Sequence, residues 1–177
     1  MIRSYIAENR ARFMEEWASL IRIPSISCQP AHKDDMLRCA ERWRELLLEA
    51  GAQHAEVMPS KGNPFVYAEY SPMEVEGERL EVKGKNIPMV LVYSHYDVMP
   101  VEPLDLWQSN PWEPTIREGR LYARGADDDK GQAMIQVKAF EYLVKHGLMN
   151  CHVKFIFEGE EEIGSPSLEA FLEEHRD

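Results

Sequence analysis

The sequence predicts an α/β fold in which helices flank a mostly parallel sheet. In the second half of the chain, apolar runs typical of strands alternate with amphipathic stretches typical of helices, and this alternation favours parallel neighbours. Residues 89–93 form a continuous apolar run, which is the pattern of a strand covered on both faces. The length of 177 residues fits one domain that can bury a sizeable core.

Two amphipathic helices are expected in the first fifty residues. Apolar residues recur at three- and four-residue steps over residues 2–21, and Pro24 then ends the helix. A second periodic stretch covers residues 35–50, and Gly51 suits the position just past a helix C-terminus. We interpret the apolar stripes of both helices, including their tryptophans, as core-facing surfaces and not as binding sites.

The remaining elements follow from the same patterns. Strands are expected at residues 55–58, 65–70, 89–93 and 153–157, with a long turn or hairpin over residues 71–86 and helices over residues 131–146 and 167–175. Gly147 ends the first of these helices, and Lys145 and His146 suit its negative C-terminal end.

Composition and charge narrow the class of protein. The formal net charge of −11 argues against nucleic acid or an anionic membrane as a partner, because both repel an acidic surface. No apolar run approaches the ~20 residues of a membrane span, and the N-terminus lacks the apolar stretch of a signal peptide. The three cysteines form no CxxC pair, so neither a disulfide framework nor a zinc knuckle is expected. We therefore expect a reduced, cytoplasmic setting.

Three polar blocks stand where the expected strands end. They are residues 95–97, which read His-Tyr-Asp, and two acidic loops over residues 125–131 and 158–165. Ligands of open α/β sheets bind beyond the carboxyl ends of the strands. The sequence therefore predicts a ligand site at one edge of the sheet.

The first block suits an imidazole that binds a metal ion. His95 and Asp97 point to the same side if the strand stays extended through them. A neutral histidine binds a metal through one ring nitrogen, while a nearby carboxylate holds the N–H of the other. Taken alone, the block is more simply a polar strand end whose histidine is hydrogen-bonded.

Each acidic block places three adjacent carboxylates in a loop. Residues 127–129 precede an expected helix, where a single Asp would suffice for capping, and residues 160–162 follow an apolar strand. Capping and simple solvation both remain open from these residues alone. Neighbouring carboxylates repel one another unless a cation is near, so a metal ion would explain both blocks.

Five stretches in order along the chain, residues 94–100, 104–107, 111–114, 119–131 and 158–165, together give a specific pattern. This pattern resembles the M20 family of di-metal aminoacylases and dipeptidases, and residues 95–107 are most similar to the dipeptidase branch. The resemblance implies hydrolysis of the amide bond of dipeptides or N-acyl amino acids on an α/β catalytic domain. Ser94 and Ala123 stand where many relatives have glycine.

The resemblance also assigns a role to each site residue. It implies that His95 binds one metal ion, that Asp128 bridges two ions and that Glu162 binds the other. Asp97 would orient His95, and Glu161 would be the general base toward a water activated by both ions. The ions would be Zn or Mn, since imidazole and carboxylate ligands suit either.

Two further expectations come from the family. The resemblance implies a cis peptide bond between Asp128 and Asp129. Family members are more than twice as long, and they add Asp and His ligands and a lid domain. We therefore expect residues 1–177 to be the N-terminal portion of the catalytic domain, without the lid domain and the C-terminal part, and to be inactive alone.

Two other interpretations stay open at this point. The chain could be a non-catalytic metal-binding or interaction module that retains a half-site, or a structural remnant with solvated carboxylates. A homo-oligomer is also left open, because a second copy could cover apolar faces of the sheet.

Overall fold

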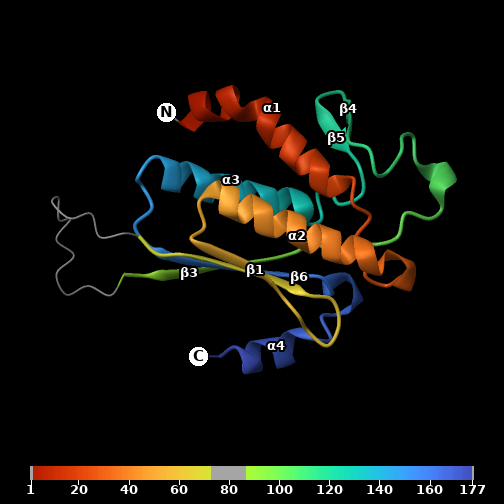
Figure 1. Cartoon of the computed structure of the whole chain (residues 1–177). Helices are drawn as coiled ribbons and strands as arrows, with labels where there is room; N and C mark the ends of the chain where they lie inside the picture. Colours follow the sequence, from red (N-terminus) through yellow and green to blue (C-terminus); the bar gives the residue numbers. More distant parts are fainter. Residues whose placement is uncertain (1, 73–86, 177) are drawn as a thin grey trace.

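A four-stranded sheet forms the middle of the molecule, and helices lie on both of its faces (Figure 1). The computed structural model describes residues 2–72 and 87–176. The strands are β1 (His54–Met58), β2 (Phe65–Tyr70), β3 (Met89–His95) and β6 (His152–Glu158), in the order β1-β2-β6-β3. A separate hairpin is formed by β4 (Thr115–Arg117) and β5 (Arg120–Tyr122). The expected α/β class with flanking helices is confirmed.

Three helices lie on one side of the sheet and a fourth lies on the other (Figure 1). They are α1 (Ile2–Ile21), α2 (Lys33–Ala50) and α3 (Lys130–Lys145) on the first side, and α4 (Leu168–Glu174) on the second. The helix α1 packs against both α2 and α3. On the opposite side, Phe171 of α4 stacks on Phe65 of β2 with ring centroids 3.9 Å apart.

The expectation of a mostly parallel sheet is wrong for the described residues. Only β3 and β6 run parallel, whereas β1 pairs antiparallel with β2, and β2 pairs antiparallel with β6. The connections explain the difference. A short turn joins β1 to β2 and allows only an antiparallel pair, whereas α3 lies between β3 and β6 and provides the crossover that a parallel pair needs.

The expectation that residues 89–93 are covered on both faces is also wrong in this structure. Met89, Val90 and Leu91 are all more than two-fifths exposed. The reason is that β3 is an edge strand of the four-stranded sheet. A continuous apolar run therefore marked a strand correctly, but it did not reveal the position of that strand in the sheet.

The core lies between the sheet and the helices α2 and α3. Trp43 of α2 is fully buried, and its ring packs edge-on against Phe157 of β6 with centroids 5.0 Å apart. Phe155 of β6 likewise packs against Phe140 of α3. These contacts confirm that the apolar stripe of α2 is a core surface, as its periodicity indicated.

The element boundaries agree with the sequence to within two residues. The largest shifts are the start of α2 at Lys33 and the end of β3 at His95, each two residues beyond expectation. The expected turn over residues 71–86 lies largely outside the described residues, and the hairpin β4–β5 was not predicted because its strands have only 3 residues each. In the described parts of the chain, no helix combines the length and apolar character needed to cross a membrane.

Candidate metal and catalytic site

The polar blocks meet at the carboxyl ends of β3 and β6. The two strands run parallel with His95 opposite Glu158, so the residues that follow each strand emerge at the same edge. The acidic loop before α3 reaches this edge as well, because Asp128 contacts His95. The predicted meeting of the three blocks is thus present in the structure.

His95 lies between carboxylates on both sides of its ring. The residue is only 6% exposed. Its Nδ1 lies 3.2 Å from Asp97 Oδ1, and its Nε2 lies 3.1 Å from Asp128 Oδ1 and 3.7 Å from Glu161 Oε2. The neutral tautomer that donates Nδ1–H to Asp97 would present its Nε2 lone pair to the side where Asp128 and Glu161 lie.

Asp97 also holds the loop that carries the two glutamates. Its side chain is fully buried. The N–H of Glu161 donates to Asp97 Oδ1 at 3.2 Å, and the N–H of Glu162 donates to Asp97 Oδ2 at 3.1 Å. One carboxylate therefore fixes both the histidine ring and the backbone of the glutamate loop, which goes beyond the role expected from the sequence.

The acidic loop before α3 is packed tightly behind Asp128. A Cβ on Gly131 would lie 2.2 Å from the carbonyl oxygen of Ala126, so only glycine allows the loop to fold over the start of the helix. Asp129 Oδ2 accepts the N–H of His95 at 3.2 Å. The peptide bond between Asp128 and Asp129 is cis, which confirms the expectation. The Asp128 side chain itself is 73% exposed and can be reached by a ligand.

The electrostatics of the site reflect its excess of carboxylates. Burial alone would lower the pKa of His95, but the hydrogen bond to Asp97 and the charges of Asp97, Asp129 and Glu161 outweigh it and raise the pKa to about 9. Burial, followed by repulsion from Asp128, raises the pKa of Glu162. The first shift favours the positive imidazolium and the second disfavours the negative carboxylate, as expected where carboxylates converge.

The donor set fits a divalent cation in chemical type, although it is sparse. Imidazole nitrogen and carboxylate oxygen are the usual ligands of Zn and Mn. Within residues 2–72 and 87–176, however, no group of three or more His, Cys, Asp or Glu side chains is arranged to hold an ion. His95 and Asp128 converge as a pair, and Glu162 lies near enough to Asp128 for their charges to interact.

Three supporting residues lie in the predicted blocks, but the sequence assigned no individual role to them. Glu158 is fully buried and accepts hydrogen bonds from Tyr93 Oη and from Ser165 Oγ, the latter at 2.9 Å. Glu160 accepts the N–H of Asn63 at 3.1 Å and so ties the β1–β2 turn to the glutamate loop. Lys130 is fully buried. Their position in the sequence beside the predicted ligands could have indicated a supporting role. Their burial could not have been predicted, because burial of a charged side chain cannot be read from one sequence.

Comparisons with known proteins agree with the geometry. Residues 91–177 match the family model described as peptidase family M20/M25/M40. The chain is 34% identical over 142 residues to the probable di- and tripeptidase DUG2 of Saccharomyces cerevisiae, which covers 79% of this chain and 16% of that protein. It is 36% identical over 184 residues to the beta-Ala-His dipeptidase of Mus musculus, which covers 98% of this chain and 36% of that protein.

Solved structures give the same result. Human carnosine dipeptidase 1 superposes with a TM-score of 0.82 at 26% identity, covering 98% of this chain and 37% of the other. An M20 family metallo-carboxypeptidase from Sulfolobus solfataricus, Sso-CP2, superposes with a TM-score of 0.77 at 34% identity, covering 92% and 34%. The chain thus spans about a third of the length of these two structures and 16% of the yeast protein.

Proposed function

The chain belongs to peptidase family M20/M25/M40, and from this premise we propose that it carries metal-binding and proton-transfer residues for hydrolysis of an amide bond. The substrate class is dipeptides or N-acyl amino acids, in keeping with relatives described as dipeptidases. Residues 1–177 are, in this proposal, the N-terminal portion of a catalytic domain, and ligands from outside them complete the metal site.

One observation carries the proposal. The Nε2 of His95 faces both Asp128 and Glu161, while Asp97 holds the opposite ring nitrogen. A merely structural histidine needs hydrogen-bond partners, but it does not need two carboxylates on its open side. This arrangement instead suits a ligand histidine beside a bridging carboxylate and a base.

The residues of the chain have distinct tasks in the reaction. His95 and Asp128 would hold one divalent ion, and Asp128 and Glu162 would hold a second, either Zn or Mn. Such ions, when bound, polarise the substrate carbonyl and make a water molecule more acidic. Glu161 accepts the proton of the attacking water and passes it to the leaving amine. Asp97 keeps the imidazole in the tautomer that leaves Nε2 free to bind.

Metal binding by the purified chain tests the proposal. We expect Mn²⁺, titrated while the free ion is followed by electron paramagnetic resonance, to bind the wild-type chain. Asp128→Ala should weaken this binding by about tenfold or more, because it removes the bridging carboxylate. The matched control is Asp127→Ala, which removes the exposed neighbouring carboxylate and should leave the affinity unchanged. Equal losses in both variants would refute the bridging role.

A second candidate is a metal-binding module without turnover. The sparse donor set favours it, since no group of three ligands converges in the described residues. We expect the isolated chain to show no robust dipeptide hydrolysis with added Zn²⁺ or Mn²⁺, because two ligands per ion define a site poorly. Turnover comparable to that of a full-length relative would show that further ligands are not required.

A further inference from the structure

Lys130 is a buried lysine at the first residue of α3. Its side chain is fully buried, a rare position for a lysine. Its Nζ donates hydrogen bonds to the carbonyl oxygens of Leu20 at 2.9 Å and Ile23 at 2.8 Å. These carbonyls lie at the C-terminal end of α1 and just beyond it, and each also accepts a backbone N–H, from Ile23 and Ser25 respectively. Lys130 therefore adds a second hydrogen bond to each carbonyl and ties the start of α3 to the end of α1.

The location of Lys130 links α1 to the site. Lys130 directly follows Asp128 and Asp129, so its anchor fixes the end of the loop that carries the exposed Asp128 carboxylate. The start of that loop packs on the same side chain, since a Cβ on Gly125 would lie 3.2 Å from Lys130 Cδ. Asp129 provides a third attachment of the loop, because its Oδ2 accepts a hydrogen bond from the N–H of His95.

We propose that Lys130 is a positioning residue for Asp128, holding the acidic loop against α1 so that the Asp128 carboxylate meets His95 Nε2. This inference rests on the proposed function for its consequence, which is tighter metal binding. Its structural content is independent of any ion. Without the Lys130 hydrogen bonds, the loop loses its anchor on α1, and the contact of Asp129 with His95 weakens.

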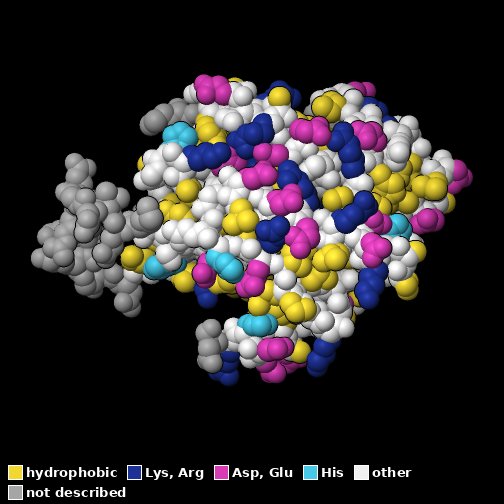
Figure 2. Space-filling view, viewed as in Figure 1, with side chains coloured by type: hydrophobic (Ala, Val, Ile, Leu, Met, Phe, Trp, Pro, Cys, Tyr) yellow, Lys and Arg dark blue, Asp and Glu magenta, His cyan; other side chains and the backbone are white. Residues whose placement is uncertain are grey.

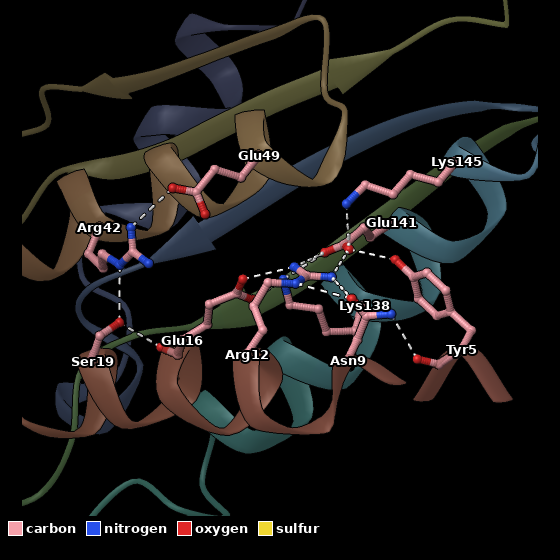
Figure 3. Close-up of polar contacts among 10 residues, drawn as sticks. All are labelled: Tyr5, Asn9, Arg12, Glu16, Ser19, Arg42, Glu49, Lys138, Glu141 and Lys145. Carbon is pink, nitrogen blue, oxygen red and sulfur yellow. Dashed lines mark hydrogen bonds and ion pairs between the residues drawn. The ribbon is translucent and has the colours of Figure 1, made fainter. Parts of the chain in front are cut away.

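Lys138 provides a matched comparison. It is a buried lysine on the same helix, and it also bonds across to α1, but its partners are the side chains of Glu16 and of Glu141 on α3 (Figure 3). None of these residues contributes to the acidic loop. A variant at Lys138 therefore weakens the packing of α1 and α3 without releasing the loop, which separates positioning from general stability.

Amide hydrogen exchange tests the inference without metal. The N–H of His95 reports the loop because it donates to Asp129, while the amides of Glu161 and Glu162 report the glutamate loop held by Asp97. We expect Lys130→Met to accelerate exchange at His95 by about tenfold relative to the other two amides. Lys138→Met should leave this ratio at the wild-type value. The same ratio in both variants would overturn the inference.

Mn²⁺ affinity gives the second measurement. Lys130→Met should weaken binding by about tenfold, and Lys138→Met should not. If the wild-type chain does not bind Mn²⁺, the proposed function fails, and the exchange ratio still decides the role of Lys130. If Lys130→Met does not fold, Lys130→Gln replaces it. If Lys138→Met does not fold, Val137→Ala, at a buried position on α3, replaces it as the control.

Discussion

Two clusters of charged residues in this molecule differ in how their carboxylates are balanced by basic groups. The interhelix cluster joins α1 to α3 (Figure 3), and its members are Tyr5, Arg12, Glu16, Lys138, Glu141 and Lys145. The strand-end cluster lies beyond β3 and β6, and its members are His95, Asp97, Asp128, Asp129, Glu161 and Glu162. The first offsets its carboxylates with basic side chains, whereas the second sets a single imidazole among carboxylates.

The pKa shifts of the two clusters differ in the same way. Burial alone would raise the pKa of Glu141, but its hydrogen bonds with Arg12, Lys138, Lys145 and Tyr5 lower it well below the ordinary value. In the strand-end cluster the pKa of Glu162 is raised. A cluster that satisfies its own charges stabilises the fold, whereas one that leaves excess negative charge can be completed by a cation.

The face of the molecule seen in Figure 2 does not show this contrast. On the face seen in Figure 2, basic side chains lie among acidic ones, so the net charge of −11 is not gathered into one acidic area there. The charge balance around individual buried groups, and not the overall charge, therefore distinguishes the two clusters.

Breaking the interhelix cluster should have the largest effect on stability. Glu141→Ala removes the carboxylate that Arg12, Lys138 and Lys145 share, while Arg12 and Lys138 keep their pairs with Glu16. Because hydrogen bonds to a buried charged group are lost, we expect a cost of about 1.5–3 kcal/mol. Urea unfolding measures the loss. The control is Glu45→Ala, which breaks a surface pair with Arg42 and should cost less than about 1 kcal/mol. Similar losses in both variants would contradict the structural role of the cluster.

The same carboxylate predicts how stability changes in acid. Because the pKa of Glu141 is lower in the folded chain than in the unfolded chain, its contribution is present above the ordinary carboxyl pKa and is lost as the pH falls through the lowered one. Urea unfolding between neutral and acidic pH should therefore show a steeper loss for the wild type than for Glu141→Gln. Parallel curves would mean that another group governs the acid transition.

The sequence anticipated the strand-end cluster far better than the interhelix cluster. Motif order placed His95, Asp128 and Glu161 together, because strand ends converge whatever the details of packing. Nothing in the sequence pairs Arg12 with Glu141, since that contact depends on how two helices far apart in the chain cross. The prediction of a mostly parallel sheet was wrong for a related reason. Strand direction depends on the connections between strands and on which strands pair, and periodicity does not reveal either.

Within the strand-end cluster, Asp97 is the residue whose charge matters most to His95. Asp97→Asn should lower the pKa of His95 from about 9, because it removes the neighbouring negative charge that favours the imidazolium. It should also weaken Mn²⁺ binding by roughly 10- to 100-fold, since the orienting partner of a ligand histidine is altered. Nuclear magnetic resonance titration of the His95 ring measures the first effect, and an unchanged pKa would contradict the assigned contact.

The smallest expected change in stability concerns Glu162, and the direction of that change distinguishes a ligand-binding role from a structural one. The pKa of Glu162 is raised, by burial first and then by repulsion from Asp128, so ionising this carboxyl costs more in the folded, metal-free chain than in the unfolded chain. Glu162→Gln removes that charge and should slightly stabilise the metal-free chain in urea while weakening Mn²⁺ binding. Glu169→Gln on α4 is the control for loss of an exposed carboxylate. A variant that destabilises the chain and leaves Mn²⁺ binding intact would place Glu162 with the structural residues.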